Sequence, residues 1–191
     1  QLKEIEAFCG NHPVFIAGST WLPDEKLLSA LVKQFPDWKF IIAPHEIGES
    51  RIKEIEELFK DSIRYSGLSG AVNLPPVLII DNIGMLSALY QYGNIAYIGG
   101  GFGAGIHNTL EAAAFGRPVI FGPNYQKFQE AKDLIRIEAA FSIKNEGELN
   151  NVFEKLRNEH FREQCGSKAS KYVEENTGAT QMILLHISEI E

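Results

Sequence analysis

Short runs of apolar residues recur along the chain, and amphipathic segments separate them. The runs do not alternate apolar with polar residues, which is typical of strands buried on both faces of a parallel sheet. Bounded by turn residues, they predict the following strands: Val14–Ala17, Phe40–Ala43, Ile63–Tyr65, Val77–Ile80, Ile95–Ile98, Val119–Phe121 and Ala140–Ile143.

The segments between the runs carry apolar residues at helical spacing, as in Leu27, Leu28, Leu31 and Val32. They predict helices over Asp24–Phe35, Ile52–Phe59, Met85–Tyr92, Thr109–Phe115, Gln126–Ile137, Glu146–Arg157, His160–Glu175 and Ala179–Glu189. A rhythm of about six strands and crossover helices predicts an α/β fold, a doubly wound and mostly parallel Rossmann-like sheet with a helical C-terminus. We expect residues 1–191 to form a single domain, with Ser66–Pro76 as a surface loop.

Composition narrows the classes of partner. The chain has 191 residues, of which 45% are hydrophobic, as in an ordinary soluble core. Its 18 basic and 25 acidic residues give a net charge of −7, which argues against a nucleic-acid binder. Cys9 and Cys165 fit no metal or redox spacing, and no apolar run approaches the length of a membrane span. The first residues, LKEIEAF, resemble the tail of a helix, so we expect a piece of a longer protein.

The most informative segment runs from Tyr97 to Pro123. A strand enters five glycines within seven residues, among them Gly100, Gly101 and Gly105, and His107, Asn108 and Glu111 follow. Glycines let a backbone approach an anion, and a helix start offers free N–H groups. Asn108 is placed to cap the helix, and Glu111 to accept hydrogen bonds from two sugar hydroxyls. This predicts one wall of a nucleotide-sugar site; a first-turn carboxylate satisfied by helix N–H groups is the alternative for Glu111.

Polar loops follow three other strands and belong to the same sheet edge. Gly18, Ser19 and Thr20 are candidates for holding a phosphate or carboxylate; an ordinary turn, with Asp24 as helix cap, is the alternative. His45 and Arg51 are candidates for facing an anion, although a solvated loop residue and a surface charge are the commoner reading. The third loop consists of Asp81, Asn82, Ile83 and Gly84. It either caps a helix and forms a turn, or it presses its backbone and the side chain of Ile83 or Met85 against a nucleobase.

Four blocks of the chain resemble the bacterial Kdo transferases, which add 3-deoxy-D-manno-oct-2-ulosonic acid (Kdo) to lipid A precursors. Gly105–Ala113 (GIHNTLEAA) is similar to their Gly-Gly-His-Asn-Pro-Leu-Glu signature. Ala17–Thr20 matches their Ala-Gly-Ser-Thr loop, and Asp81–Leu86 with Tyr90 resembles their Asp-Thr-Met-Gly-Glu-Leu…Tyr segment. The family pattern is also matched at Ile98–Gly100 and at Phe121–Asn124 with Phe128. The blocks keep the family's order across residues 14–130.

Two positions depart from the family pattern. Where the family has Pro-Arg-His after the second strand, this chain has Ala43-Pro44-His45, so the arginine is missing and Arg51 is a candidate substitute. Where it has Gly-Gly before the signature histidine, this chain has Gly105-Ile106, which adds a side chain beside the expected ligand.

The resemblance implies the carboxy-terminal, donor-binding half of an inverting GT-B glycosyltransferase of lipopolysaccharide biosynthesis in a Gram-negative bacterium. It implies CMP-Kdo as donor, a lipid A precursor as acceptor and no metal or other cofactor. In the family the general base, acceptor surface and contact with the cytoplasmic face of the inner membrane lie in the amino-terminal half. We therefore expect a soluble fragment that has no catalytic residue of its own, binds donor and transfers nothing alone.

The resemblance also suggests a role for each loop. Ser19 and Thr20 would contact the phosphate or donor carboxylate, and Asp81–Gly84 the base. Gly100–Gly105, with His107 and Asn108, would hold the phosphate side, and Glu111 the ribose. Two other classes stay open: another GT-B transferase or epimerase that uses a UDP-sugar, and a non-catalytic nucleotide-binding module.

Overall fold

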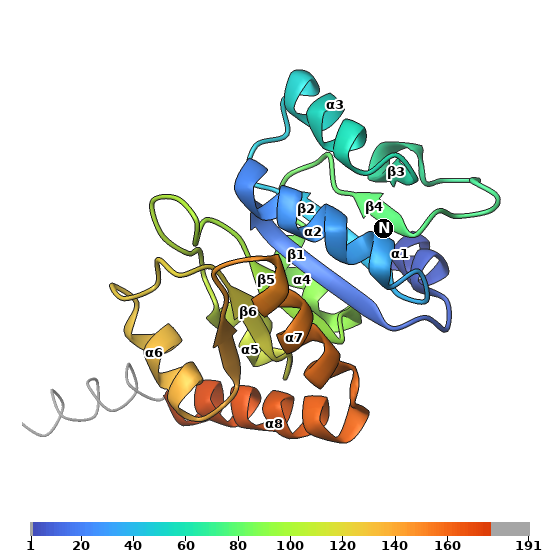
Figure 1. The fold of residues 1–191 in the computed structure, drawn as a ribbon. Coiled ribbons are helices and arrows are strands. Elements are labelled where there is room, and N and C mark those ends of the chain that lie inside the picture. The colour runs from blue at the N-terminus through green and yellow to red at the C-terminus, as the bar shows by residue number, and fades with distance from the viewer. Residues whose placement is uncertain (1, 177–191) are drawn as a thin grey trace, which may run out of the picture.

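One seven-stranded sheet organises residues 2–176, the part of the chain that this computed structural model describes (Figure 1). Its strands are β1 (Val14–Thr20), β2 (Lys39–Pro44), β3 (Ser62–Arg64), β4 (Val77–Ile79), β5 (Ile95–Ile98), β6 (Val119–Phe121) and β7 (Ala140–Ser142). Their order is β3-β4-β2-β1-β5-β6-β7, and every neighbouring pair is parallel. The predicted strands and the doubly wound Rossmann-like α/β fold are confirmed.

Both faces of the sheet are buried, which explains the unbroken apolar runs. In β1, Phe15 and Ala17 belong to one core cluster, whereas Val14 and Ile16 belong to the other. All four side chains are at most 2% exposed. Successive side chains of a strand point to opposite faces, so a strand with helices on both sides needs apolar residues at every position.

Helices cover the two faces in separate layers (Figure 1). The helices α2 (Leu22–Gln34), α3 (Glu49–Leu58) and α7 (Glu146–Arg157) pack on one face. On the other lie α1 (Leu2–Cys9), α4 (Leu86–Leu89), α5 (Leu110–Ala114) and α6 (Gln129–Arg136). The long α8 (Glu159–Asn176) contacts both α5 and α7. Among residues 2–176, no helix combines the length and the apolar character that crossing a membrane requires.

Several predicted helices differ from the structure in their bounds, as α3 does, which begins at Glu49 rather than Ile52. The predicted helix Met85–Tyr92 is divided into α4 and a 3₁₀ turn, η2 (Tyr90–Tyr92), and a second 3₁₀ turn, η1 (Tyr65–Gly67), follows β3. Tightening of the last turn is common where a helix ends close to the next strand, and β5 begins three residues later. The predicted helix Gln126–Ile137 begins only at Gln129. The predicted helix Ala179–Glu189 lies outside the described residues.

The sheet changes winding direction at β1. Its neighbours are β2 on one side and β5 on the other, so the connections that follow β1 and β5 diverge at the carboxyl edge. In doubly wound folds this switch point forms the crevice in which ligands bind. The loop after β1 and the glycine-rich loop after β5 (Gly99–Gly105, hereafter the glycine loop) both begin here.

The ends of β1 and β5 touch backbone to backbone at this switch point. A Cβ at Gly99 would lie 2.2 Å from the carbonyl oxygen of Ser19 and 2.6 Å from the Cα of Thr20. Ser19 itself has a φ of 53°, where the register of β1 on β2 shifts between Gly18 and Thr20. A left-handed serine and an obligatory glycine thus meet where the two loops leave the sheet.

This contact predicts that Gly99→Ala lowers the free energy of unfolding by about 2–3 kcal/mol, because the methyl group has no room and the two strand ends must separate. Gly103→Ala, in the same loop, is the matched control: its Cβ would lie 3.6 Å from the nearest atom, so we expect a change within about 0.5 kcal/mol. Urea unfolding followed by tryptophan fluorescence measures both. Equal stability of the two variants would refute this close contact.

Candidate functional site

Two pockets open at the carboxyl edge of the sheet, and His107 lines both. The larger has a volume of about 390 Å³ and the smaller of about 180 Å³. The larger pocket is lined by Trp21, Pro23, Asp24, Gly100, Phe102, Gly103, Ala104, Gly105 and His107. The smaller pocket is lined by Ser19, Leu86, Tyr90, Ile98, His107, Asn108 and Glu111. The two together form the candidate site.

Glu111 is the anionic group of the smaller pocket. One carboxylate oxygen accepts a hydrogen bond from Nδ2 of Asn108 (2.9 Å), and the other accepts one from the hydroxyl of Ser87 on α4 (2.5 Å). These partners are side chains rather than the helix N–H groups of the alternative interpretation. They hold the half-buried carboxylate at the pocket wall, where it can accept hydrogen bonds from a ligand's hydroxyls.

Asn108, the predicted cap, lies one residue before Thr109, which is the N-cap residue of α5, and its side chain bonds the first residue of the helix. Its Oδ1 accepts a hydrogen bond from the backbone N–H of Leu110 (3.0 Å), while its Nδ2 donates to Glu111. The amide therefore fixes the helix start and the carboxylate together. The helix has only five residues, so its dipole supplies less positive potential than a long helix would.

Most backbone N–H groups of the glycine loop already donate hydrogen bonds to acceptors within the loop or in neighbouring segments. Backbone N–H groups with an acceptor inside the protein are those of Gly99, Gly100, Gly103, Gly105, Ile106 and His107. Gly101 instead permits close packing, since a Cβ there would lie 2.6 Å from the backbone nitrogen of Gly122. Gly105, with a φ of +138°, packs against Phe128. A phosphate cradle made by these N–H groups stays a prediction, and it requires some of these bonds to open.

Three rings gather at the border of the two pockets. His45 stacks on Trp21 and on His107, with ring centroids 4.6 Å apart in each pair. The indole Nε1 of Trp21 donates a long hydrogen bond to Nε2 of His107 (3.4 Å). That nitrogen is the acceptor, so the imidazole is neutral in this arrangement. Burial lowers the pKa of His107, the neighbouring His45 lowers it further, and the negative charge of Asp24 opposes both.

Thr20 and Arg51 face the interior rather than the pockets. The buried hydroxyl of Thr20 donates to Oε1 of Glu25 (2.9 Å), and Arg51 forms an ion pair with the other oxygen of the same carboxylate. Arg51 also pairs with Glu54 (3.1 Å). Burial raises the pKa of Glu25, and Arg51 and Thr20 act against this shift. The cluster ties α2 to α3 beside the loop after β1, and its guanidinium already has two carboxylate partners.

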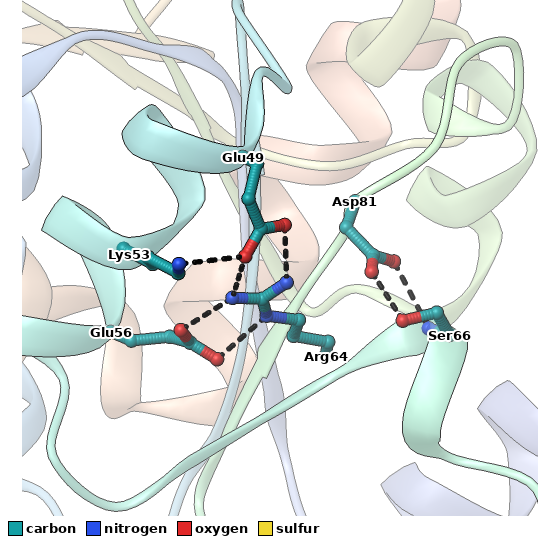
Figure 2. A network of polar contacts seen from close by, with 6 residues as sticks. All are labelled: Glu49, Lys53, Glu56, Arg64, Ser66 and Asp81. Carbon is teal, nitrogen blue, oxygen red and sulfur yellow. Dashed lines mark hydrogen bonds and ion pairs between the residues drawn. The ribbon is translucent and has the colours of Figure 1, made fainter.

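Asp81 anchors a loop at the far side of the sheet, after β4. Its carboxylate accepts hydrogen bonds from the backbone N–H (3.0 Å) and hydroxyl of Ser66, as Figure 2 shows. Beside it, Arg64 at the end of β3 is held by Glu49 (2.8 Å) and Glu56 (2.7 Å) of α3 (Figure 2). These carboxylates raise the pKa of Arg64 further. The contacts fix the outer wall of the sheet edge.

The rest of this loop presents an exposed apolar side chain. Ile83 is 85% exposed, Gly84 has a φ of +91°, and Oδ1 of Asn82 is buried without a hydrogen-bond partner. The loop leads directly into α4, whose Ser87 contacts Glu111. It therefore approaches the smaller pocket, although its four residues are not among the pocket's lining residues.

The structure brings together part of the predicted site. Ser19, His107, Asn108 and Glu111 share the smaller pocket, and Gly100, Gly105 and His107 share the larger one. Gly18 lies below them: a Cβ there would lie 2.1 Å from the hydroxyl of Tyr90. Predicted residues that line neither pocket are Gly18, Thr20, His45, Arg51, Gly101 and Asp81–Gly84.

Sequence reasoning missed Trp21, Asp24 and Ser87. The signal for the first two was their place, directly after a strand end that a doubly wound fold brings to the ligand edge. Asp24, the helix cap of the alternative interpretation, does bond the backbone N–H of Trp21 at the start of α2, and it is fully buried. Ser87 carried no signal, because only the fold brings α4 beside α5. Among residues 2–176, no group of three or more metal-ligating side chains is placed to hold a metal ion.

Sequence comparison finds relatives among glycosyltransferases, although no protein-family model matches the chain. A bifunctional glycosyltransferase/methyltransferase of Fusobacterium nucleatum is 29% identical over 99% of this chain and 30% of its own length. A 3-deoxy-D-manno-octulosonic acid transferase of Rickettsia felis is 33% identical over 78% of this chain and 34% of its own length. The chain thus spans about a third of the length of the curated relatives it matches.

Solved structures share the fold. The C-terminal CMP-Kdo binding domain of WaaA from Acinetobacter baumannii superposes with a TM-score of 0.73 and 22% identity, over 90% of this chain and 98% of that domain. Anabaena HepE, solved in complex with UDP-glucose, gives a TM-score of 0.64 and 15% identity over 99% of this chain and 53% of its own. The described chain therefore has the architecture of one GT-B half.

The environment of His107 predicts an acid-sensitive stability. Its pKa is lowered in the folded state, so the unfolded chain binds the proton more tightly and stability falls as the pH drops below about 6.5. Replacing His107 by glutamine removes this contribution. Between pH 7.5 and 5.5 we expect the Tm of H107Q to fall less than that of the wild type.

His160 on α8 is exposed and serves as the control, since H160Q should follow the wild type. Thermal unfolding followed by circular dichroism at each pH measures the three proteins. Parallel curves for the wild type and H107Q would contradict the neutral, partly buried state of this imidazole.

Proposed function

Because the chain is homologous to part of the 3-deoxy-D-manno-octulosonic acid transferases, we propose that it is the donor-binding domain of such an enzyme. It binds CMP-Kdo, from which the complete protein transfers Kdo to a lipid A precursor. The observation that carries the proposal is the smaller pocket, where Ser19, His107, Asn108 and Glu111 meet at the switch point of a GT-B half. These residues come from the two sequence blocks that most resemble the family.

The smaller pocket suits the nucleoside monophosphate part of the donor. Glu111 accepts hydrogen bonds from the two ribose hydroxyls, in place of its present partners Asn108 and Ser87. The Asp81–Gly84 loop, which leads into α4, lies against the base. Ser19 and the freed amide of Asn108 supply donors for the phosphate, and those N–H groups of the glycine loop that have an internal acceptor add to them only if these bonds open.

His107 borders both pockets, so it stands at the junction between nucleotide and sugar. The larger pocket, with Trp21 and Phe102 in its wall, takes the Kdo sugar. Transfer is a direct displacement at the anomeric carbon with CMP as leaving group, and it needs a base for the acceptor hydroxyl. Asp24 is the carboxylate of this pocket, but it already accepts three hydrogen bonds from the protein, so we do not assign the role of this base to it.

The remaining parts of the proposal concern the whole enzyme. The base, the lipid A precursor and the contact with the cytoplasmic face of the inner membrane belong to a further domain, so residues 1–191 bind donor without transferring it. Donor binding needs no metal. A UDP-sugar enzyme of the same architecture is the competing function, since HepE shares the fold.

We predict that CMP binds to the wild-type chain, with and without EDTA, more tightly than UMP or UDP-glucose. Glu111→Gln should weaken CMP binding about tenfold, because a hydrogen bond to a charged acceptor contributes about 1.5–3 kcal/mol. Isothermal titration calorimetry measures each affinity. Glu163→Gln, on the exposed surface of α8, is the matched control and should bind like the wild type.

The ligand series separates the two functions. Tighter binding of UDP-glucose than of CMP would favour the UDP-sugar enzyme and contradict the proposal. Absence of CMP and CMP-Kdo binding at millimolar ligand would refute a donor site altogether. Transfer of Kdo by the 191 residues alone would show that the base lies within them.

A further inference from the structure

Asp24 is a fully buried carboxylate that no binding role has so far explained. It sits in the first turn of α2 and is 0% exposed. Its three hydrogen-bond donors come from different segments: the backbone N–H of Trp21 (2.9 Å), the hydroxyl of Tyr97 in β5 (2.6 Å) and the backbone N–H of Gly100 (3.0 Å). All three donors are neutral groups. A buried charge without a cationic partner is costly, and it persists only where several donors are fixed around it.

The two carboxylate oxygens of Asp24 accept hydrogen bonds from different donors. Oδ1 accepts from Tyr97, which lies in the core beneath the site. Oδ2 accepts from both Trp21 and Gly100, so one atom joins the start of α2 to the glycine loop. One carboxylate oxygen can accept from both N–H groups because it has more than one lone pair. A hydroxyl group in the same place would lack the negative charge that strengthens these bonds.

Trp21 and Gly100 also both lie against His107, at the edge of the ring that carries Nε2. The indole Nε1 of Trp21 donates to Nε2 of His107 (3.4 Å). Gly100 leaves room for the ring: a Cβ on it would lie 3.1 Å from Cδ2 and 3.3 Å from Nε2 of His107. The backbone N–H of His107 in turn donates to Gly99, the neighbour of Gly100 (3.3 Å).

We propose that Asp24 is a positioning residue of the donor site, which places His107 between the two pockets by fixing Trp21 and Gly100 with one carboxylate oxygen. The proposal rests on the proposed function only for the identity of the ligand. The geometry of His107 depends on Asp24 whatever the ligand is. Tyr97 supports the carboxylate from below and does not touch His107.

Asp24→Asn and Tyr97→Phe form a matched pair that separates positioning from stability. Y97F removes one of the three hydrogen bonds to the carboxylate, and D24N replaces the carboxylate itself, so each lowers the stability of the fold. In D24N the negative charge disappears and the amide has only one oxygen to share among the three donors. In Y97F the oxygen that joins Trp21 to Gly100 keeps both partners.

The first readout is the imidazole of His107, followed by NMR of ring-labelled histidine in the full chain. The negative charge of Asp24 raises the pKa of His107. In D24N we therefore expect the titration midpoint of His107 to move to lower pH and its ring signals to shift. In Y97F we expect both to stay as in the wild type. An unchanged His107 in D24N, or the same change in Y97F, would overturn the proposal.

The second readout is the affinity for CMP, measured by calorimetry well below the Tm of each variant. We expect D24N to bind about tenfold more weakly and Y97F to bind within twofold of the wild type. Equal losses in both variants would mean that stability alone explains them, which would overturn the positioning role. If the wild type does not bind CMP, the proposed function fails, while the His107 titration still decides the role of Asp24.

Hydrogen exchange of the wild-type chain gives a test that does not depend on D24N folding. The backbone N–H groups of Trp21 and Gly100 lie in a helix start and a loop, where exchange is ordinarily fast. Held by a buried carboxylate, both should exchange as slowly as the amides of β1 and β5. Fast exchange at either position would show that Asp24 does not hold them, and would overturn the proposal.

Discussion

The contact of Ser19 with Gly99 is the constraint on which the site depends. It brings the ends of β1 and β5 within backbone van der Waals distance at the switch point of the sheet. The loops that leave these ends are therefore fixed relative to each other before any side chain is considered. Ser19 accepts a left-handed backbone there, a local strain that is commonly kept where a binding site requires it.

Polar side chains then shape the two pockets at the carboxyl edge of the sheet. Glu111, held by Asn108 and Ser87, gives the smaller pocket an anionic acceptor suited to hydroxyl groups. Asp24 bonds both the glycine loop and Trp21 beside His107, and His107 lies between the smaller and the larger pocket. Two arginines at this edge of the sheet form ion pairs within the protein. Arg51 pairs with Glu25. Arg64 pairs with Glu49 and Glu56 (Figure 2). The two pockets thus offer a ligand hydrogen-bonding groups and a defined shape.

Apolar runs such as Val14–Ala17 predicted the parallel sheet well, because a strand buried on both faces leaves an unambiguous pattern. The Gly105–Ala113 signature likewise grouped His107, Asn108 and Glu111, which line one pocket, but it did not indicate Ser87. The partners of Asp24 and Thr20 were not predictable, because polar residues after a strand look alike in sequence whether they face water or the core. Glycine patterns were similarly ambiguous: Gly101 serves backbone packing, a role that spacing alone does not separate from anion binding.

An NMR titration of the labelled chain with CMP-Kdo tests the central claim, that the donor binds at the β1–β5 switch point, most directly. The account predicts that the largest backbone shifts fall on Ser19, Asn108 and Glu111, with His107 responding on both sides of its ring. A groove of about 670 Å³ between α6 and α8, which includes Arg136 and Lys168, provides the internal contrast. Shifts centred on that groove, with Ser19 and Glu111 unmoved, would contradict the account.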